Sequence, residues 1–152
     1  MKQHHYKIGI EWTGNQGSGT DSYTSYSRDH VIVSEGKPTI PGSSEPAFRG
    51  DRTRYNPEEL LVSTLSSCHM LWYLHLCAVA GVVVEEYRDE ATGVMEQGPD
   101  GSGPITEVTL HPKVKISAGD RDKAISIHEE AHHMCNIARS VNFRVRCEAT
   151  LV

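Results

Sequence analysis

The most reactive side chains in this sequence are four cysteines, and two of them, Cys68 and Cys135, have polar or ionisable neighbours. His69 follows Cys68 directly, while His132 and His133 come shortly before Cys135. A thiol in such a setting is either a small buried hydrophobe or a redox nucleophile whose sulfenic acid a second thiol can capture. The residue types alone leave both interpretations open.

The other two cysteines, Cys77 and Cys147, are better explained as packing residues. On a helix, Cys77 would point roughly opposite to Cys68, because nine residues separate them. Cys147 belongs to an alternating segment and falls on its apolar side. The sequence contains no Cys-x-x-Cys pair, so neither a zinc ribbon nor a thioredoxin-type motif is indicated.

A second chemical motif comes from another enzyme class. His128, Glu129 and His132 satisfy the His-Glu-x-x-His pattern, in which two helical histidines bind zinc and the glutamate is a general base. No candidate third ligand lies on a following helix, because the pattern becomes strand-like within about ten residues. A solvated helix face, or imidazoles near a thiol, is the simpler interpretation, and a metal site at His128 and His132 is the alternative.

The segment that carries Cys68 has a defined helix start. Asn56 is a suitable N-cap, Pro57 suits the first helical position, and two glutamates follow in the first turn. We expect the helix to run to Ala80 and to stop at Gly81. Its apolar residues lie on almost all sides, and its length would be about 36 Å. That is long for the interior of one small globule, so we expect a second subunit to complete its burial.

A second helix is predicted from Asp120, its N-cap, and its buried stripe consists of residues at helical spacing: Ala124, Ile127, Ala131, Met134 and Ala138. Alternation predicts strands within 6–12, 22–33, 82–95, 105–117 and 143–151, and 36–55 is expected to be irregular. The order βββ-α-ββ-α-β indicates an α+β architecture, with residues 1–152 forming a single domain.

Composition restricts the partners. The net charge of −5 argues against nucleic acid and against anionic membranes as partners. The N-terminus lacks the apolar stretch of a signal peptide, and no run of about 18 apolar residues is present. We therefore expect a cytoplasmic protein, in which a structural disulfide framework would be out of place.

Two of these features together resemble a known family. Asn56-Pro-Glu-Glu-Leu, a helical cysteine ten residues after Glu58, and the later Cys135 are similar to the signature of OsmC/Ohr proteins. The order of strands and helices is similar over nearly the whole chain. The resemblance implies an OsmC-like fold, an intertwined homodimer with central buried helices, and a thiol-dependent peroxidase that detoxifies organic hydroperoxides without a cofactor.

The resemblance also implies residue roles. Cys68 would be the peroxidatic thiolate and Cys135 the resolving thiol, and an external dithiol or lipoylated protein would reduce their disulfide. Glu58 matches the family glutamate near the reacting thiol. The family arginine has no direct match: Ala47 stands at the aligned loop position, so Arg49 is the first candidate and Arg28 the second.

Two features of the sequence qualify this reading. Ten helical residues place Glu58 about 15 Å from Cys68, so we expect Glu58 to serve Cys68 of the partner subunit. Asn136 follows Cys135, where many relatives have proline. The alternative is therefore a non-catalytic OsmC-fold protein that binds a small apolar or sulfur-containing ligand.

Overall fold

The computed structural model describes residues 1–152, which divide into two compact units, 1–60 and 61–152. Two α-helices and nine strands alternate along the chain, so the predicted α+β class is confirmed.

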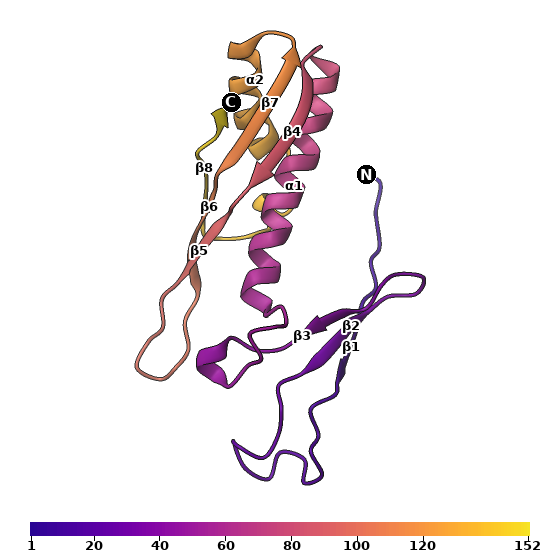
Figure 1. The fold of residues 1–152 in the computed structure, drawn as a ribbon, viewed down its shortest axis with the longest axis vertical. Coiled ribbons are helices and arrows are strands. Elements are labelled where there is room, and N and C mark those ends of the chain that lie inside the picture. The colour runs from indigo at the N-terminus through magenta and orange to yellow at the C-terminus, as the bar shows by residue number, and fades with distance from the viewer. The chain divides into compact units, whose positions relative to one another are not determined.

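The first unit contains one antiparallel sheet of three short strands (Figure 1). These are β1 (Gly9–Trp12), β2 (His30–Val33) and β3 (Ile40–Gly42), in that order. The strand predicted over 22–33 is shorter, because residues 13–29 form a long loop instead. The Trp12 indole closes that loop by donating to the Ser27 carbonyl oxygen at 2.8 Å.

The region 36–55, predicted to be irregular, contains two short elements. One is β3, and the other is a 3₁₀ turn, η1 (Pro46–Phe48). Pro41 lies in the middle of β3 and hides its strand pattern in the sequence. Proline is tolerated there because β3 is an edge strand of its sheet.

The predicted long helix is present as α1 (Pro57–Val79). Asn56 and Glu59 cap its start reciprocally: the Asn56 side chain accepts from the Glu59 amide at 2.8 Å, and the Glu59 carboxylate accepts from the Asn56 amide at 3.2 Å. By length and composition, α1 could cross a membrane, a property shared by core helices of globular proteins. Its fully buried residues follow a four-residue spacing: Leu65, His69, Tyr73 and Cys77.

Each long strand predicted in the second unit is divided in two. The pairs are β4 (Val83–Asp89) with β5 (Thr92–Met95), β6 (Ile105–Leu110) with β7 (Pro112–Ala118), and β8 (Arg144–Cys147) with β9 (Thr150–Leu151). They form two three-stranded sheets, ordered β4-β7-β9 and β5-β6-β8. In both sheets the hairpin strands are antiparallel and the C-terminal strand is parallel to its neighbour.

The Asp89 carboxylate connects α1, through two hydrogen bonds, to the point where the strands are interrupted. Its Oδ1 accepts from the backbone amide of His111, the residue between β6 and β7, at 2.7 Å. Its Oδ2 accepts from the Ser66 hydroxyl of α1 at 2.5 Å. One carboxylate therefore holds the helical turn that precedes Cys68 against the break in the strands.

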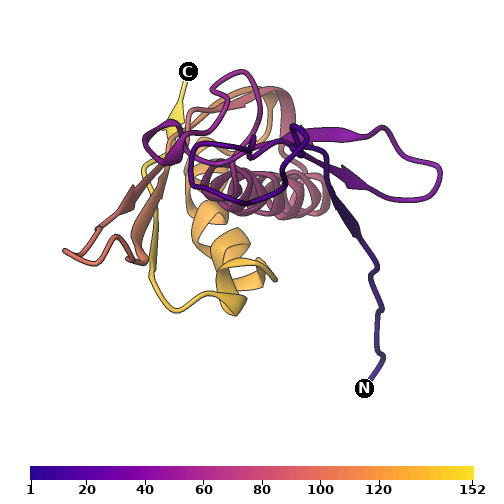
Figure 2. The same cartoon turned by 90° about the horizontal axis from the view of Figure 1, so that it is seen from below.

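The second helix, α2 (Arg121–Met134), begins as predicted, since the Asp120 side chain accepts from the Lys123 amide at 2.7 Å. Figure 1 shows α2 running along β4 and β7, and Figure 2 shows it beside α1. The core between these elements includes Tyr73, Val114 and Ile127.

The buried stripe predicted for this helix is only partly correct. Ala124, Ile127 and Ala131 are buried, but Met134 is 40% exposed because α2 ends there. Ala138 falls in a separate 3₁₀ turn, η2 (Ala138–Ser140). Cys135 occupies the C-cap position between the two, in an extended backbone conformation.

Candidate functional site

Cys68 and Cys135 come from different elements of the second unit and meet in its interior. Cys68 projects from the middle of α1 and is half-buried, whereas Cys135 at the α2 C-cap is 1% exposed. The Cys68 thiol lies near enough to Cys135 to contribute to the shift in the pKa of that thiol. Both thiols are free. Of the two, Cys68 is the one that a dissolved reactant can reach.

The surroundings of Cys135 favour its protonated form. Burial is the main cause that raises the pKa of the Cys135 thiol, and the neighbouring Cys68 adds to it. The Ala138 backbone amide donates to the Cys135 sulfur at 3.4 Å and acts in the opposite direction. Cys135 is thus held as a thiol beside the more accessible Cys68.

A second group of donor atoms lies nearby in the same unit. His69 of α1, His128 of α2 and Cys147 of β8 bring one nitrogen or sulfur atom each within 4.8 Å of one another. The His69 Nε2 atom is 3.0 Å from His128 Nδ1, and the Cys147 sulfur is 3.7 Å and 3.9 Å from these two atoms. One sequence interpretation is thereby corrected and a second is extended. The partners of His128 are His69 and Cys147 rather than His132, and Cys147 contacts imidazoles as well as packing in the core.

Burial keeps both imidazoles of this group neutral. Desolvation lowers the pKa of His69 and of His128 from 6.5 to about 4 in each case. The Tyr73 ring stacks on His128, with centroids 3.9 Å apart and planes 13° apart. Burial, with the charges of Asp89 and Glu148, raises the pKa of Cys147 to about 11.

Sequence reasoning named His69 only as a neighbour of Cys68 and did not single out Tyr73 as part of a site. The available signal was their four-residue spacing with Leu65 and Cys77, which identifies the most deeply buried face of α1. That signal is weak because apolar residues occur on nearly every side of this helix.

The two glutamates at the start of α1 have different environments. Glu59 is the partner of Asn56 in the capping box, which leaves Glu58 outside the cap. Because α1 is continuous from Pro57 to Val79, about 15 Å of helix separates Glu58 from Cys68, as expected.

The two candidate arginines belong to the first unit and differ in side-chain contacts and in backbone conformation. Arg28 donates to the carbonyl oxygens of Tyr26 and Tyr23, both at 2.7 Å, and its guanidinium lies 3.9 Å from the Tyr26 ring centroid. Arg49 is exposed and has a φ of 64°, and it is the only residue other than glycine with a positive φ. Such a backbone conformation is strained for a residue with a Cβ atom.

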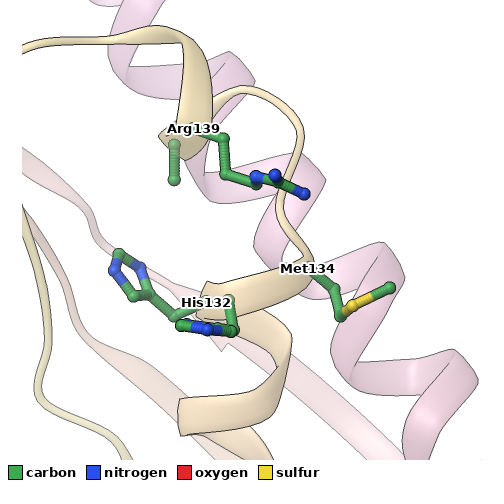
Figure 3. A pocket seen from close by; sticks show the side chains of 5 residues that line it. His132, Met134 and Arg139 are labelled. Atoms are coloured by element: carbon green, nitrogen blue, oxygen red, sulfur yellow. The ribbon is translucent and has the colours of Figure 1, made fainter.

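A pocket of about 390 Å³ lies where α2 ends. Its lining includes one guanidinium, two imidazoles and a thioether, and it consists of His132, His133, Met134, Ala138 and Arg139. In Figure 3, Arg139 on the turn after α2 lies across the pocket from His132 and Met134. The pocket thus adjoins the C-cap that carries Cys135, and His132 lines it without being one of the three donors His69, His128 and Cys147.

Comparison with protein families places this geometry in context. Residues 50–150 match the family described as OsmC-like protein. This chain belongs to the OsmC-like family. A solved OsmC-like protein of unknown function from Vibrio cholerae is 30% identical, with a TM-score of 0.87 over 97% of this chain and 100% of that one.

Two further solved structures share the fold of this OsmC-like protein at lower identity. An organic hydroperoxide resistance protein from Elizabethkingia anophelis is 20% identical, with a TM-score of 0.68 over 99% of this chain and 98% of that one. The organic hydroperoxide resistance protein OhrB of Bacillus subtilis is 21% identical, with a TM-score of 0.61 over 97% and 98%. Comparison with proteins of curated function found no match.

Proposed function

We propose that this OsmC-like protein is a thiol-dependent peroxidase that reduces organic hydroperoxides. The observation that carries the proposal is the meeting of a half-buried Cys68 with a buried Cys135 from another element. The family assignment supports the same reaction, since proteins named for organic hydroperoxide resistance share the fold. The reductant is a dithiol or a lipoylated protein, and the location is the cytoplasm.

The reaction balances with these two thiols. The Cys68 thiolate attacks one peroxide oxygen, the O–O bond breaks, and the alkoxide leaves as an alcohol after taking up a proton. Cys68 becomes a sulfenic acid. The Cys135 sulfur then displaces its hydroxyl as water, which forms a Cys68–Cys135 disulfide. A dithiol reduces that disulfide and restores both thiols.

The roles of Cys68 and Cys135 are not interchangeable in this proposal. The attacking thiol must meet a dissolved peroxide, and Cys135, at 1% exposure, is sealed from solvent within the chain. A resolving thiol needs only to reach the neighbouring sulfenic acid. Its raised pKa also keeps Cys135 from competing as the first nucleophile.

The full site requires a second subunit in this proposal. Glu58 is too far along α1 to serve its own Cys68, and only four of the 23 residues of α1 are buried in the single chain. Leu71, on the same helix, is 63% exposed. A homodimer would cover such residues and bring Glu58, with Arg49, to Cys68 of the partner subunit, where the two would form the polar environment of the reaction and the guanidinium would stabilise the leaving alkoxide.

The direct test is stopped-flow reaction of the reduced protein with cumene hydroperoxide, followed by mass mapping of disulfides. We expect rapid consumption of the peroxide and a Cys68–Cys135 bond. Cys68→Ser should abolish consumption, and Cys77→Ala should leave it unchanged, because Cys77 lies in a separate part of the core. A wild-type protein that binds cumene hydroperoxide but neither consumes it nor forms the bond would instead be a binding protein.

A further inference from the structure

The group formed by His69, His128 and Cys147 has no role in the proposed peroxidase reaction. Its members come from three elements, α1, α2 and β8, and two of the three are buried. Each presents a nitrogen or sulfur atom to the other two. Such convergence of ligand atoms across three elements requires a physical explanation.

Hydrogen bonding alone satisfies this group poorly. The contact between His69 Nε2 and His128 Nδ1 uses one proton and one lone pair. The Cys147 sulfur is then left at 3.7 Å and 3.9 Å from the same two atoms, with only a weak S–H donor to offer. The third member is therefore not accounted for by a simple histidine pair.

We propose that His69, His128 and Cys147 bind one zinc-class metal ion through Nε2, Nδ1 and Sγ. A triangle with sides of 3.0, 3.7 and 3.9 Å has a circumradius of about 2.1 Å, which matches zinc–nitrogen and zinc–sulfur bond lengths of about 2.0–2.3 Å. An ion can thus reach all three atoms with side-chain shifts of only a few tenths of an ångström.

The donor types select the metal. Two imidazoles and a thiolate suit Zn²⁺, whereas Mg²⁺ and Ca²⁺ prefer oxygen ligands. Burial already keeps both imidazoles in the neutral form that ligates. The thiol must lose its proton, which a bound metal ion promotes. Three protein ligands leave a fourth tetrahedral position for water.

This arrangement has one cost. When Nε2 of His69 binds the ion, its ring proton lies on Nδ1, which is buried and has no partner in the chain. A buried donor without a partner lowers stability. The bonds from three protein ligands to a metal ion are expected to outweigh one such donor.

The test is metal binding by the reduced, full-length protein after chelator treatment. We expect one equivalent of Co²⁺ per chain, with a thiolate-to-cobalt charge-transfer band, and displacement by Zn²⁺. Cys147→Ala should remove the band and weaken Zn²⁺ binding by more than about 100-fold. His133→Gln is the matched control and should change neither, because His133 is exposed and lies outside the group.

A second arm separates this site from the proposed peroxidase. The double variant C68S/C135S should bind Co²⁺ with the same stoichiometry and band as the wild type, whatever its activity. His128→Gln provides a further ligand deletion should Cys147→Ala fail to fold. Absence of stoichiometric binding in the wild type, or an unchanged band in Cys147→Ala, would overturn the proposal.

Discussion

Tyr73 lies flat against His128 and donates its hydroxyl hydrogen to the Ala124 carbonyl oxygen at 2.8 Å. One side chain of α1 thereby contacts α2 at two points, one through its ring and one through its hydroxyl. The nearby Tyr87 of β4 is different, since its hydroxyl is buried without a partner in the chain. These two tyrosines form a natural pair for measuring the value of one buried hydrogen bond.

We expect Tyr73→Phe to lower the free energy of unfolding by about 0.5–1.5 kcal/mol, because it removes a satisfied hydrogen bond and keeps the ring. Tyr87→Phe should leave stability unchanged or raise it, because it removes an unsatisfied hydroxyl. Urea unfolding of both variants measures the difference. Equal destabilisation by the two substitutions would contradict this account.

Acid should destabilise the metal-free protein through His69 and His128. In the unfolded chain these imidazoles take up protons near pH 6.5, but in the folded chain only near pH 4. Between these values the unfolded state binds more protons, so the free energy of unfolding falls as the pH falls. One such pKa shift corresponds to a loss of about 3 kcal/mol in the free energy of unfolding. Because the two rings are in contact, the loss from both histidines together is less than twice that value.

Urea unfolding of chelator-treated protein from about pH 7 to pH 4 measures this loss. His133→Gln is a suitable control, because His133 is exposed and should not alter the slope. His128→Gln should flatten the profile. A stability that is independent of pH over this range would show that the imidazoles are not held neutral by burial.

Glu58 and Glu59 should separate activity from stability. Glu58→Gln is expected to lower kcat/KM for cumene hydroperoxide by about 10²-fold or more, because it removes a charged group from the polar environment of the reaction. Glu59→Ala should instead cost about 0.5–2 kcal/mol of stability through loss of its half of the capping box. Steady-state kinetics and urea unfolding of each variant distinguish the two roles.

A mixed dimer tests whether Glu58 acts across subunits. One chain carries Glu58→Gln and the other carries Cys68→Ser, so each homodimer alone should be impaired. If Glu58 serves Cys68 of the partner subunit, the mixed dimer contains one complete site and regains about half of wild-type activity. An inactive mixed dimer would place Glu58 and Cys68 of one chain in the same site.

Arg49 should show a trade-off between stability and activity. Arg49→Gly relieves a backbone φ of 64° and should raise the free energy of unfolding by about 1 kcal/mol. In the proposed site it also removes the guanidinium, so peroxidase activity should fall by about 10²-fold or more. Arg28→Gln is the comparison, and it should chiefly destabilise the loop that holds Tyr23 and Tyr26. Loss of activity only in Arg28→Gln would exchange the two assignments.

Much of the fold could be predicted because its signals are local. Asn56, Pro57 and Asp120 act through hydrogen bonds and backbone geometry within a few residues, and both helix starts were placed correctly. The strand breaks near Asp89 and His111 could not be predicted, since they depend on contacts between distant segments. Alternation continues through them in the sequence.

The candidate site was predictable to a similar extent. Cys68 and Cys135 stood out through their polar neighbours, and Cys68 contributes to the raised pKa of the Cys135 thiol. Cys147 was assigned to the core because an apolar strand face does not indicate which side chains lie opposite it. The contact of His128 with His69 joins residues 59 positions apart, and the local His-Glu-x-x-His pattern pointed to His132 instead.

The carboxylate of Asp89 determines where Cys68 of α1 lies relative to the strands. The carboxylate accepts hydrogen bonds from the Ser66 hydroxyl and from the His111 backbone amide. The position of the helix relative to the strands is therefore set by these two bonds rather than by the ends of the helix. Insertions or deletions in the remote turn at residues 96–104 should therefore leave the position of the Cys68 thiol unchanged. An insertion beside residue 90 or 111 would displace it, even though neither residue is near Cys68 in the sequence.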